Sequence, residues 1–174
     1  MNILNHEFKA RINDIKPYED LLISKNPFFQ GVDHQKDTYF NVPYGRLKLR
    51  EGNIENALIQ YDREDIAGSK LSKIILYKHS PDPALKEILT MQFGVKVIVD
   101  KVRRIYFIDN VKFHFDAIVG LGYFLEVEAI DTEGTFTTLE LQKQCDAYLD
   151  FFGLSANDLV QSSYSDILIA QGLD

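Results

Sequence analysis

The chain has 174 residues, of which 45% are hydrophobic, so it can bury a core and is expected to form one domain over residues 1–174. Its formal net charge of −7 argues against nucleic acid or an anionic membrane as a partner. The single Cys145 permits no internal disulfide, and the longest apolar run, 117–125, is too short to span a bilayer. The N-terminus also lacks the residue order of a signal peptide, and these features together predict a cytoplasmic protein.

Alternating polar and apolar residues predict eight β-strands with helical segments between them. Eight strands joined mostly by short loops indicate an α+β protein, in which an antiparallel β-barrel or a strongly curved sheet has helices packed outside. The helices are expected after Pro17, over 83–93, over 139–152 and after Ser155, and the segment 162–166 resembles a helix start. In chain order, the strands are expected at residues 3–13, 35–42, 46–50, 57–63, 73–78, 95–108, 111–118 and 123–130.

The most informative segment is 125–129, where Glu126 and Glu128 are two residues apart on a predicted strand. Because side chains alternate along a strand, both carboxylates point to one side, about 7 Å apart, while their apolar neighbours point to the other. Two like charges at that distance repel each other unless a cation lies between them. The pair therefore predicts a bound metal ion.

Positive charges alternate in the same way on other predicted strands. Arg46, Lys48 and Arg50 share one strand face, and the segment 7–11 carries Glu-x-Lys-x-Arg on one face. Charged strand positions ordinarily face water. Here, however, the charges are segregated by sign within strands, and apolar residues fill the opposite face. This pattern favours a barrel with a charged interior and an apolar exterior covered by helices.

Several of these segments, taken in order, resemble the CYTH superfamily, also called triphosphate tunnel metalloenzymes. The resemblance extends from Asn5 to about Tyr148 and is greatest for the class IV adenylyl cyclase-like branch, whose relatives include thiamine triphosphatases and inorganic triphosphatases. It rests on the Glu-x-Lys-x-Arg strand at 7–11, on DTYF at 37–40, on GRLKLRE at 45–51, on YDR at 61–63 and on DAIVGLGYFLEVE at 116–128.

The resemblance implies an eight-stranded tunnel that holds a triphosphate among lysines and arginines, with Mg²⁺ or Mn²⁺ bound at one side. The implied metal ligands are Glu7, Glu126 and Glu128. Lys9, Arg50 and Asp116 are implied in catalysis, Asp116 also as a helper at the metal. The residues implied in holding the phosphates are Arg11, Arg46, Lys48, Arg63, Arg104 and Lys112, with Lys73 or Lys78 joining from the fifth predicted strand.

One position departs from the pattern of the family. Its first strand normally carries Glu-x-Glu-x-Lys, and here Asn5 replaces the first Glu. An amide oxygen can coordinate a metal but adds no charge, so we expect weaker metal binding or one ion fewer. His114, between Lys112 and Asp116 on the charged face, could be a ligand or a proton shuttle, although a lone histidine is more often structural.

These features leave several functions open. The first is a metal-dependent enzyme, either a cyclase that converts ATP to cyclic AMP and pyrophosphate or a triphosphatase that hydrolyses inorganic, thiamine or nucleoside triphosphate. The second is a non-catalytic phosphate-binding module, which Asn5 makes plausible. The third is a small-molecule barrel unrelated to phosphate, against which the runs of cations argue. Tunnel enzymes of the cyclase branch are often dimers, so a homodimer is a possible assembly.

Overall fold

The computed structural model describes residues 2–63 and 70–172, with side chains at 4–62 and 74–172. Its strands form a closed antiparallel barrel in the order β1-β5-β4-β3-β2-β6-β7-β8, which β1 completes by pairing with β8. The predicted antiparallel barrel is confirmed. The strands are β1 (Asn2–Ile12), β2 (Phe28–Phe40), β3 (Arg46–Glu51), β4 (Ala57–Arg63), β5 (Lys70–Lys78), β6 (Val95–Ile108), β7 (Val111–Ile118) and β8 (Gly122–Asp131).

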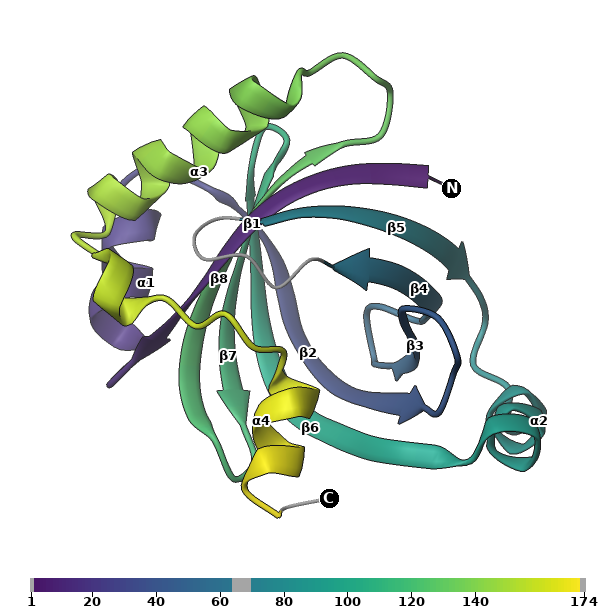
Figure 1. Ribbon diagram of the computed structural model, residues 1–174. Helices are drawn as coiled ribbons and strands as arrows, with labels where there is room; N and C mark the ends of the chain where they lie inside the picture. Colours follow the sequence, from purple (N-terminus) through teal and green to yellow (C-terminus); the bar gives the residue numbers. More distant parts are fainter. Residues whose placement is uncertain (1, 64–69, 173–174) are drawn as a thin grey trace.

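The helices lie outside the barrel, with α1 and α3 on one side and α2 on the other (Figure 1). Pro17 stands in the first turn of α1, and Asp82 and Thr137 cap α2 and α3 by accepting backbone N–H groups. α3 packs against β1 and β8. No helix in the described part of the chain is long and apolar enough to cross a membrane. The helices are α1 (Lys16–Ile23), α2 (Pro83–Phe93), α3 (Thr138–Phe151), the 3₁₀ helix η1 (Ala156–Asp158) and α4 (Tyr164–Ala170).

A helix does start after Ser155, as predicted, but it is the 3₁₀ helix η1 and ends after a single turn. Ser155 and Asp158 form a capping box, and the chain then becomes extended at Leu159. There it forms a β-bridge with Ala10, and the Val160 N–H donates to the Lys9 carbonyl at 2.8 Å. Because the chain pairs with β1 here, the helix does not continue, and the extended chain then runs on to α4. The strand predicted at 35–42 is also too short, since β2 begins at Phe28.

The main apolar core lies between the outer face of the barrel and the helices α1 and α3. Alternate residues of β1, β7 and β8 supply it, including Phe8, Phe113, Leu125 and Val127, and Leu141 of α3 packs against them. On the described part of these strands, the side chains that alternate with the core residues point into the barrel. The charged interior and apolar exterior predicted from alternation are therefore present.

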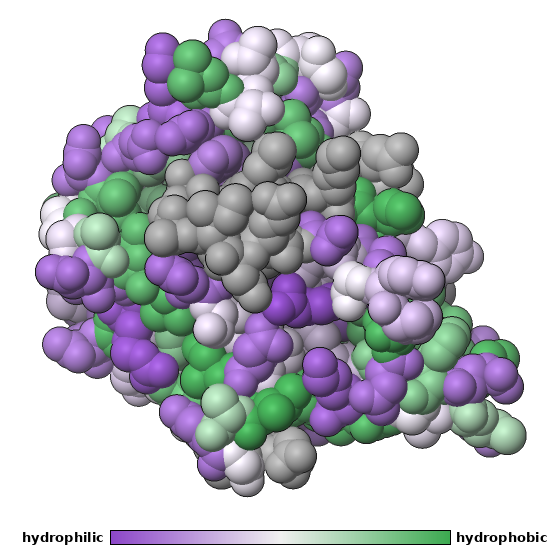
Figure 2. All heavy atoms as spheres, in the orientation of Figure 1, coloured by the Kyte–Doolittle hydropathy of each residue, from purple (hydrophilic) through white to green (hydrophobic). Residues whose placement is uncertain are grey.

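The antiparallel order also determines which loops share an end of the barrel. The loops 41–45 and 119–121 lie at one end together with α4, which we call the α4 end. The loop 52–56 and the turn at 109–110 lie at the other, which we call the β3–β4 end. On the face seen in Figure 2, polar and apolar side chains are interspersed.

Candidate functional site

On one wall of the lumen, Asp37 of β2 is surrounded by cations from the neighbouring strands β3 and β6. Its carboxylate accepts two hydrogen bonds from Arg50, each of 2.9 Å, and lies 3.0 Å from Nζ of Lys48 and 2.8 Å from Nζ of Lys101. Burial alone would raise the pKa of Asp37, but Arg50, Lys101 and Lys48 hold it well below its ordinary value. Burial and then the charge of Arg103 lower the pKa of Lys101 to about 7. This wall therefore presents closely spaced cations around one ionised carboxylate.

Arg103 on β6 joins the carboxylates of the opposite wall. It donates to Asp116 at 2.7 and 2.6 Å and to Glu126 at 2.7 Å. Lys9 lies 3.1 Å from the other oxygen of Glu126. Tyr164, at the start of α4, donates to Asp116 at 3.0 Å, and its ring centre is 3.9 Å from Nζ of Lys9. Residues expected from the sequence in catalysis, Lys9 and Asp116, thus meet in the lumen beside an aromatic ring from α4.

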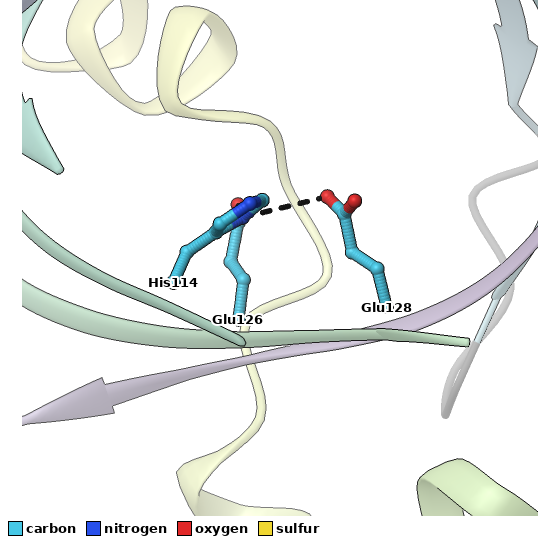
Figure 3. A group of neighbouring side chains, drawn as sticks. All are labelled: His114, Glu126 and Glu128. Atoms are coloured by element: carbon cyan, nitrogen blue, oxygen red, sulfur yellow. Dashed lines mark hydrogen bonds and ion pairs between the residues drawn. The ribbon is translucent and has the colours of Figure 1, made fainter. Parts of the chain in front are cut away.

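His114, Glu126 and Glu128 form a group that could hold a metal ion. They rise from β7 and β8 toward the same side (Figure 3), and one ligand atom from each lies within 4.8 Å of the others. Burial and then the charge of Glu7 raise the pKa of Glu128 to about 7. Burial and then Arg103 lower the pKa of His114 to about 3, so its imidazole is neutral at pH 7. Two carboxylates and a neutral imidazole are ligands suited to a divalent cation.

Two further observations support a ligand at this place. The Nε2 atom of His114 and the Oδ1 atom of Asn5 are buried and have no hydrogen-bond partner within the described residues. Buried polar atoms are normally satisfied, so a metal ion or its water would supply what is lacking. Glu7 lies across from Glu128 in the β1–β8 register and accepts a hydrogen bond from Asn5 at 3.3 Å. Asn5 therefore lies next to the acidic group, as expected from the sequence.

The outermost predicted cations lie at the α4 end. Arg46 pairs with Asp166 of α4 at 2.8 Å, and Arg11 donates to the Leu121 carbonyl at 2.7 Å. A cavity of about 300 Å³ opens beside Arg46 and is also lined by Tyr39, Lys96 and Ser165. Arg46 and Arg11 therefore lie at the mouth of the barrel and not at its centre.

Other predicted phosphate-binding residues have different positions. Lys112 lies in the lumen and contacts Glu55, whereas Lys78 is exposed at the end of β5. The side chains of Arg63 and Lys73 lie outside the described part of the structure.

The placement of Arg104 among the lumen cations is wrong. Its Nε atom lies 2.6 Å from Glu19 of α1, on the outer face of the barrel. Arg103, one residue earlier, is the arginine of β6 that enters the lumen, since neighbouring residues on a strand face opposite sides. Both faces of β6 carry aliphatic residues and cations, with Lys101 and Arg103 on one face and Lys96 and Arg104 on the other, so alternation did not distinguish the two faces.

Sequence reasoning missed Asp37, Glu55, Lys101 and Arg103 as lumen residues. Asp37 lies on a predicted strand and within the DTYF segment at 37–40, which was a usable signal, whereas alternation on β6 gave none for Lys101 and Arg103. Glu55 lies in a loop, where no periodicity indicates the direction of a side chain.

Comparison with known proteins agrees with this geometry. The family model of the CYTH domain matches residues 4–164, and a comparison with curated proteins found no match. Among solved structures, the PH1012 protein of Pyrococcus horikoshii OT3 is 22% identical, with a TM-score of 0.79 over 93% of this chain and 98% of that chain. A putative adenylate cyclase of Vibrio parahaemolyticus is 19% identical, with a TM-score of 0.77 over 95% of this chain and 98% of that chain.

A third similar structure is a putative adenylyl cyclase of Hippeastrum with a dominant triphosphatase activity. It is 15% identical, with a TM-score of 0.64 over 99% of this chain and 96% of that chain. At such identities the likeness to these structures shows a shared fold and not a shared reaction.

Proposed function

The chain belongs to the CYTH domain family, and from this premise we propose that it is a divalent-metal-dependent enzyme acting on a triphosphate bound inside its barrel. The first candidate reaction is of the adenylyl cyclase type, in which ATP yields cyclic AMP and pyrophosphate. The observation that carries the proposal is the juxtaposition of a cation-lined lumen with the group His114, Glu126 and Glu128. Lysine and arginine bind phosphate oxygens, and carboxylates bind Mg²⁺ or Mn²⁺.

The charge balance of the lumen favours joint binding of metal and triphosphate. The cations described above already contact carboxylates, chiefly Asp37, Asp116 and Glu126. A triphosphate carries about four negative charges at neutral pH, and the paired cations leave little net positive potential to attract it. A divalent ion at the acidic group would restore that potential. We therefore expect triphosphate to bind more tightly when the metal is present.

The residues have separable roles in this proposal. Glu126, Glu128 and His114 would hold Mg²⁺ or Mn²⁺, with Glu7 and Asn5 beside them. When bound, such an ion neutralises phosphate charge and polarises the phosphorus under attack. The lumen lysines and arginines hold the phosphate oxygens, while Asp37 and Asp116 orient those cations through paired hydrogen bonds. Such fixed positioning is the main source of acceleration in phosphoryl transfer.

The cavity at the α4 end supports a substrate that carries an organic group. Its volume of about 300 Å³ lies at the lower limit of small-molecule sites, and Tyr39 and Arg46 connect its lining to the lumen face of the barrel. A nucleoside could occupy it while the phosphates extend inward. Triphosphatase activity is the alternative, supported by the similarity to the Hippeastrum protein. A non-catalytic phosphate-binding module remains the second alternative, because Asn5 contributes no charge.

Activity assays with ATP, inorganic triphosphate and thiamine triphosphate, each with Mg²⁺ or Mn²⁺, test the proposal. Cyclic AMP with pyrophosphate would identify a cyclase, and orthophosphate a triphosphatase. Lys101→Ala should abolish activity, and the exposed Lys36→Ala on the neighbouring strand is the matched control. Metal-dependent binding without turnover would identify a binding module. Neither binding nor turnover with any of the three compounds would refute the proposal.

A further inference from the structure

Glu55 reaches across the barrel from the loop 52–56 that joins β3 and β4. Its carboxylate contacts Nζ of Lys112 on β7, lies 3.0 Å from Nη1 of Arg50 and accepts a hydrogen bond from Gln35 at 3.1 Å. In the strand order of the barrel, β4 and β7 stand on opposite sides of the ring. A side chain that starts beside β4 therefore bridges the interior to the far wall.

The backbone of this loop is held firmly in place. The fully buried Asp33 accepts the N–H groups of Ile54 and Glu55, both at 2.9 Å. The Asn56 side chain pairs with the N–H and the carbonyl of Gly52 at 3.0 and 2.9 Å. A Cβ atom at Gly52 would lie 2.6 Å from the carboxylate of Asp33, so only glycine allows this close approach. These contacts fix the backbone of the loop and so hold Glu55 in its inward position.

The surroundings of Glu55 are those of a bound phosphate oxygen. A lysine, an arginine and an amide N–H converge on its carboxylate, which is the donor set that recognises anions in proteins. Burial alone would raise the pKa of Glu55, but Lys112 and Arg50 hold it well below its ordinary value. The chain therefore places a permanent negative charge of its own at the β3–β4 end of the lumen.

We propose that Glu55 limits the length of the phosphate chain that the barrel accepts. It pairs with Arg50 and Lys112, which lie toward the β3–β4 end of the lumen, so a triphosphate ends before it, whereas a longer inorganic polyphosphate meets a like charge in a desolvated site. Glu55 is thereby a specificity-determining residue of the same lumen, and this inference rests on the proposed function. Among the described side chains of the lumen, the cations left for substrate are Lys9, Lys48, Lys101 and Arg103, together with the side of Arg50 that faces Asp37.

Glu55→Gln tests the inference, because the amide keeps the size of the side chain and removes its charge. Calorimetric titration with inorganic triphosphate and with inorganic tetraphosphate, both in Mg²⁺, gives the ratio of the two dissociation constants. We expect the substitution to shift this ratio toward tetraphosphate by about tenfold. Glu51→Gln is the matched control, because Glu51 pairs with Lys86 of α2 at 2.7 Å on the outside of the barrel, and it should leave the ratio unchanged.

Several outcomes would overturn the inference. Equal tightening of both ligands would mean that Glu55 only weakens the overall potential, and no change in either dissociation constant would mean that the chain does not reach Glu55. If the wild type binds triphosphate and either result is found, this inference alone fails. If the wild type binds neither ligand with any metal, the proposed function fails as well. If Glu55→Gln does not fold, Glu55→Asp is measured instead, because its shorter side chain withdraws the carboxylate and keeps the charge. A ratio of the two dissociation constants equal to that of the wild type then overturns the inference.

Discussion

Replacement of Glu128 by glutamine is expected to stabilise the metal-free protein at pH 8. The Glu128 side chain is 18% exposed, and burial and then the charge of Glu7 raise its pKa from 4.5 to about 7. At pH 8 the folded state must therefore ionise a carboxyl group that ionises more easily in the unfolded chain. The shift corresponds to at most about 3 kcal/mol. We expect about 1–2 kcal/mol of added stability, a rise in Tm of roughly 2–8 °C.

The pH dependence of this effect has a definite sign. A carboxyl whose folded-state pKa is raised destabilises the protein increasingly as pH rises from about 4.5 to 7, and the effect then levels off. Near pH 4.5 the carboxyl of Glu128 is protonated in the folded state and about half protonated in the unfolded chain. The stability difference between wild type and Glu128→Gln should then fall to a few tenths of a kcal/mol.

Glu126→Gln is the matched contrast on the same strand face. Glu126 lies 3.1 Å from Lys9 and 2.7 Å from Arg103, so its loss leaves buried cations underpaired and should destabilise the protein by about 1–3 kcal/mol. Denaturation with urea in EDTA, at pH 8 and at pH 4.5, measures both variants. Adding Mn²⁺ should stabilise the wild type more than Glu128→Gln, since a metal ligand is missing from the variant. Equal destabilisation of both variants at pH 8 without metal would refute this reasoning.

Other predictions concern single positions. Arg103→Ala should weaken triphosphate binding at least about tenfold and Arg104→Ala should change it less than about twofold, as measured by calorimetry with Tm determined in parallel; the reverse order would contradict the lumen assignment. Asn5→Glu should tighten Mn²⁺ binding because it adds a charged ligand, and an unaltered titration would exclude that side chain from the metal group. Burial raises the pKa of Cys145 to about 12, so its thiol should resist a disulfide reagent at pH 8 until denaturant is added, and rapid modification of the native protein would speak against its buried position.

The barrel could be predicted because several strands have one uniformly apolar face. In β1, β7 and β8 the residues that contact α3 or the core alternate regularly with charged residues, so the period of two identified both the strand and its inner face. The order of the motifs then supported the family resemblance, which implied that these inner faces line one tunnel. The acidic pair Glu126 and Glu128 was predictable for the same reason.

The rest of the site depends on tertiary contacts that alternation does not encode. On β6 both faces mix apolar and charged residues, and Arg104 was chosen where Arg103 enters the lumen. Glu55 enters through the fold of a loop that Asp33 anchors from another strand. The sequence left open whether His114 is a ligand, a proton shuttle or a structural residue, and the register of β7 and β8, which sets it beside Glu126, favours a ligand.

The pairing of β1 with β8 constrains the order in which the chain can fold. β1 contains the first described residues, and its partners β5 and β8 begin at Lys70 and Gly122. On the ribosome, β1 must therefore wait for β5 before its first edge is covered and for β8, and so for most of the chain, before its second edge is covered, and closure joins segments far apart in sequence. Such non-local pairing is entropically slow, and open strand edges invite association between chains. One face of β1 carries the charges of Glu7, Lys9 and Arg11. These charges would keep the unpaired strand from associating with other chains until β8 has been synthesised and pairs with it.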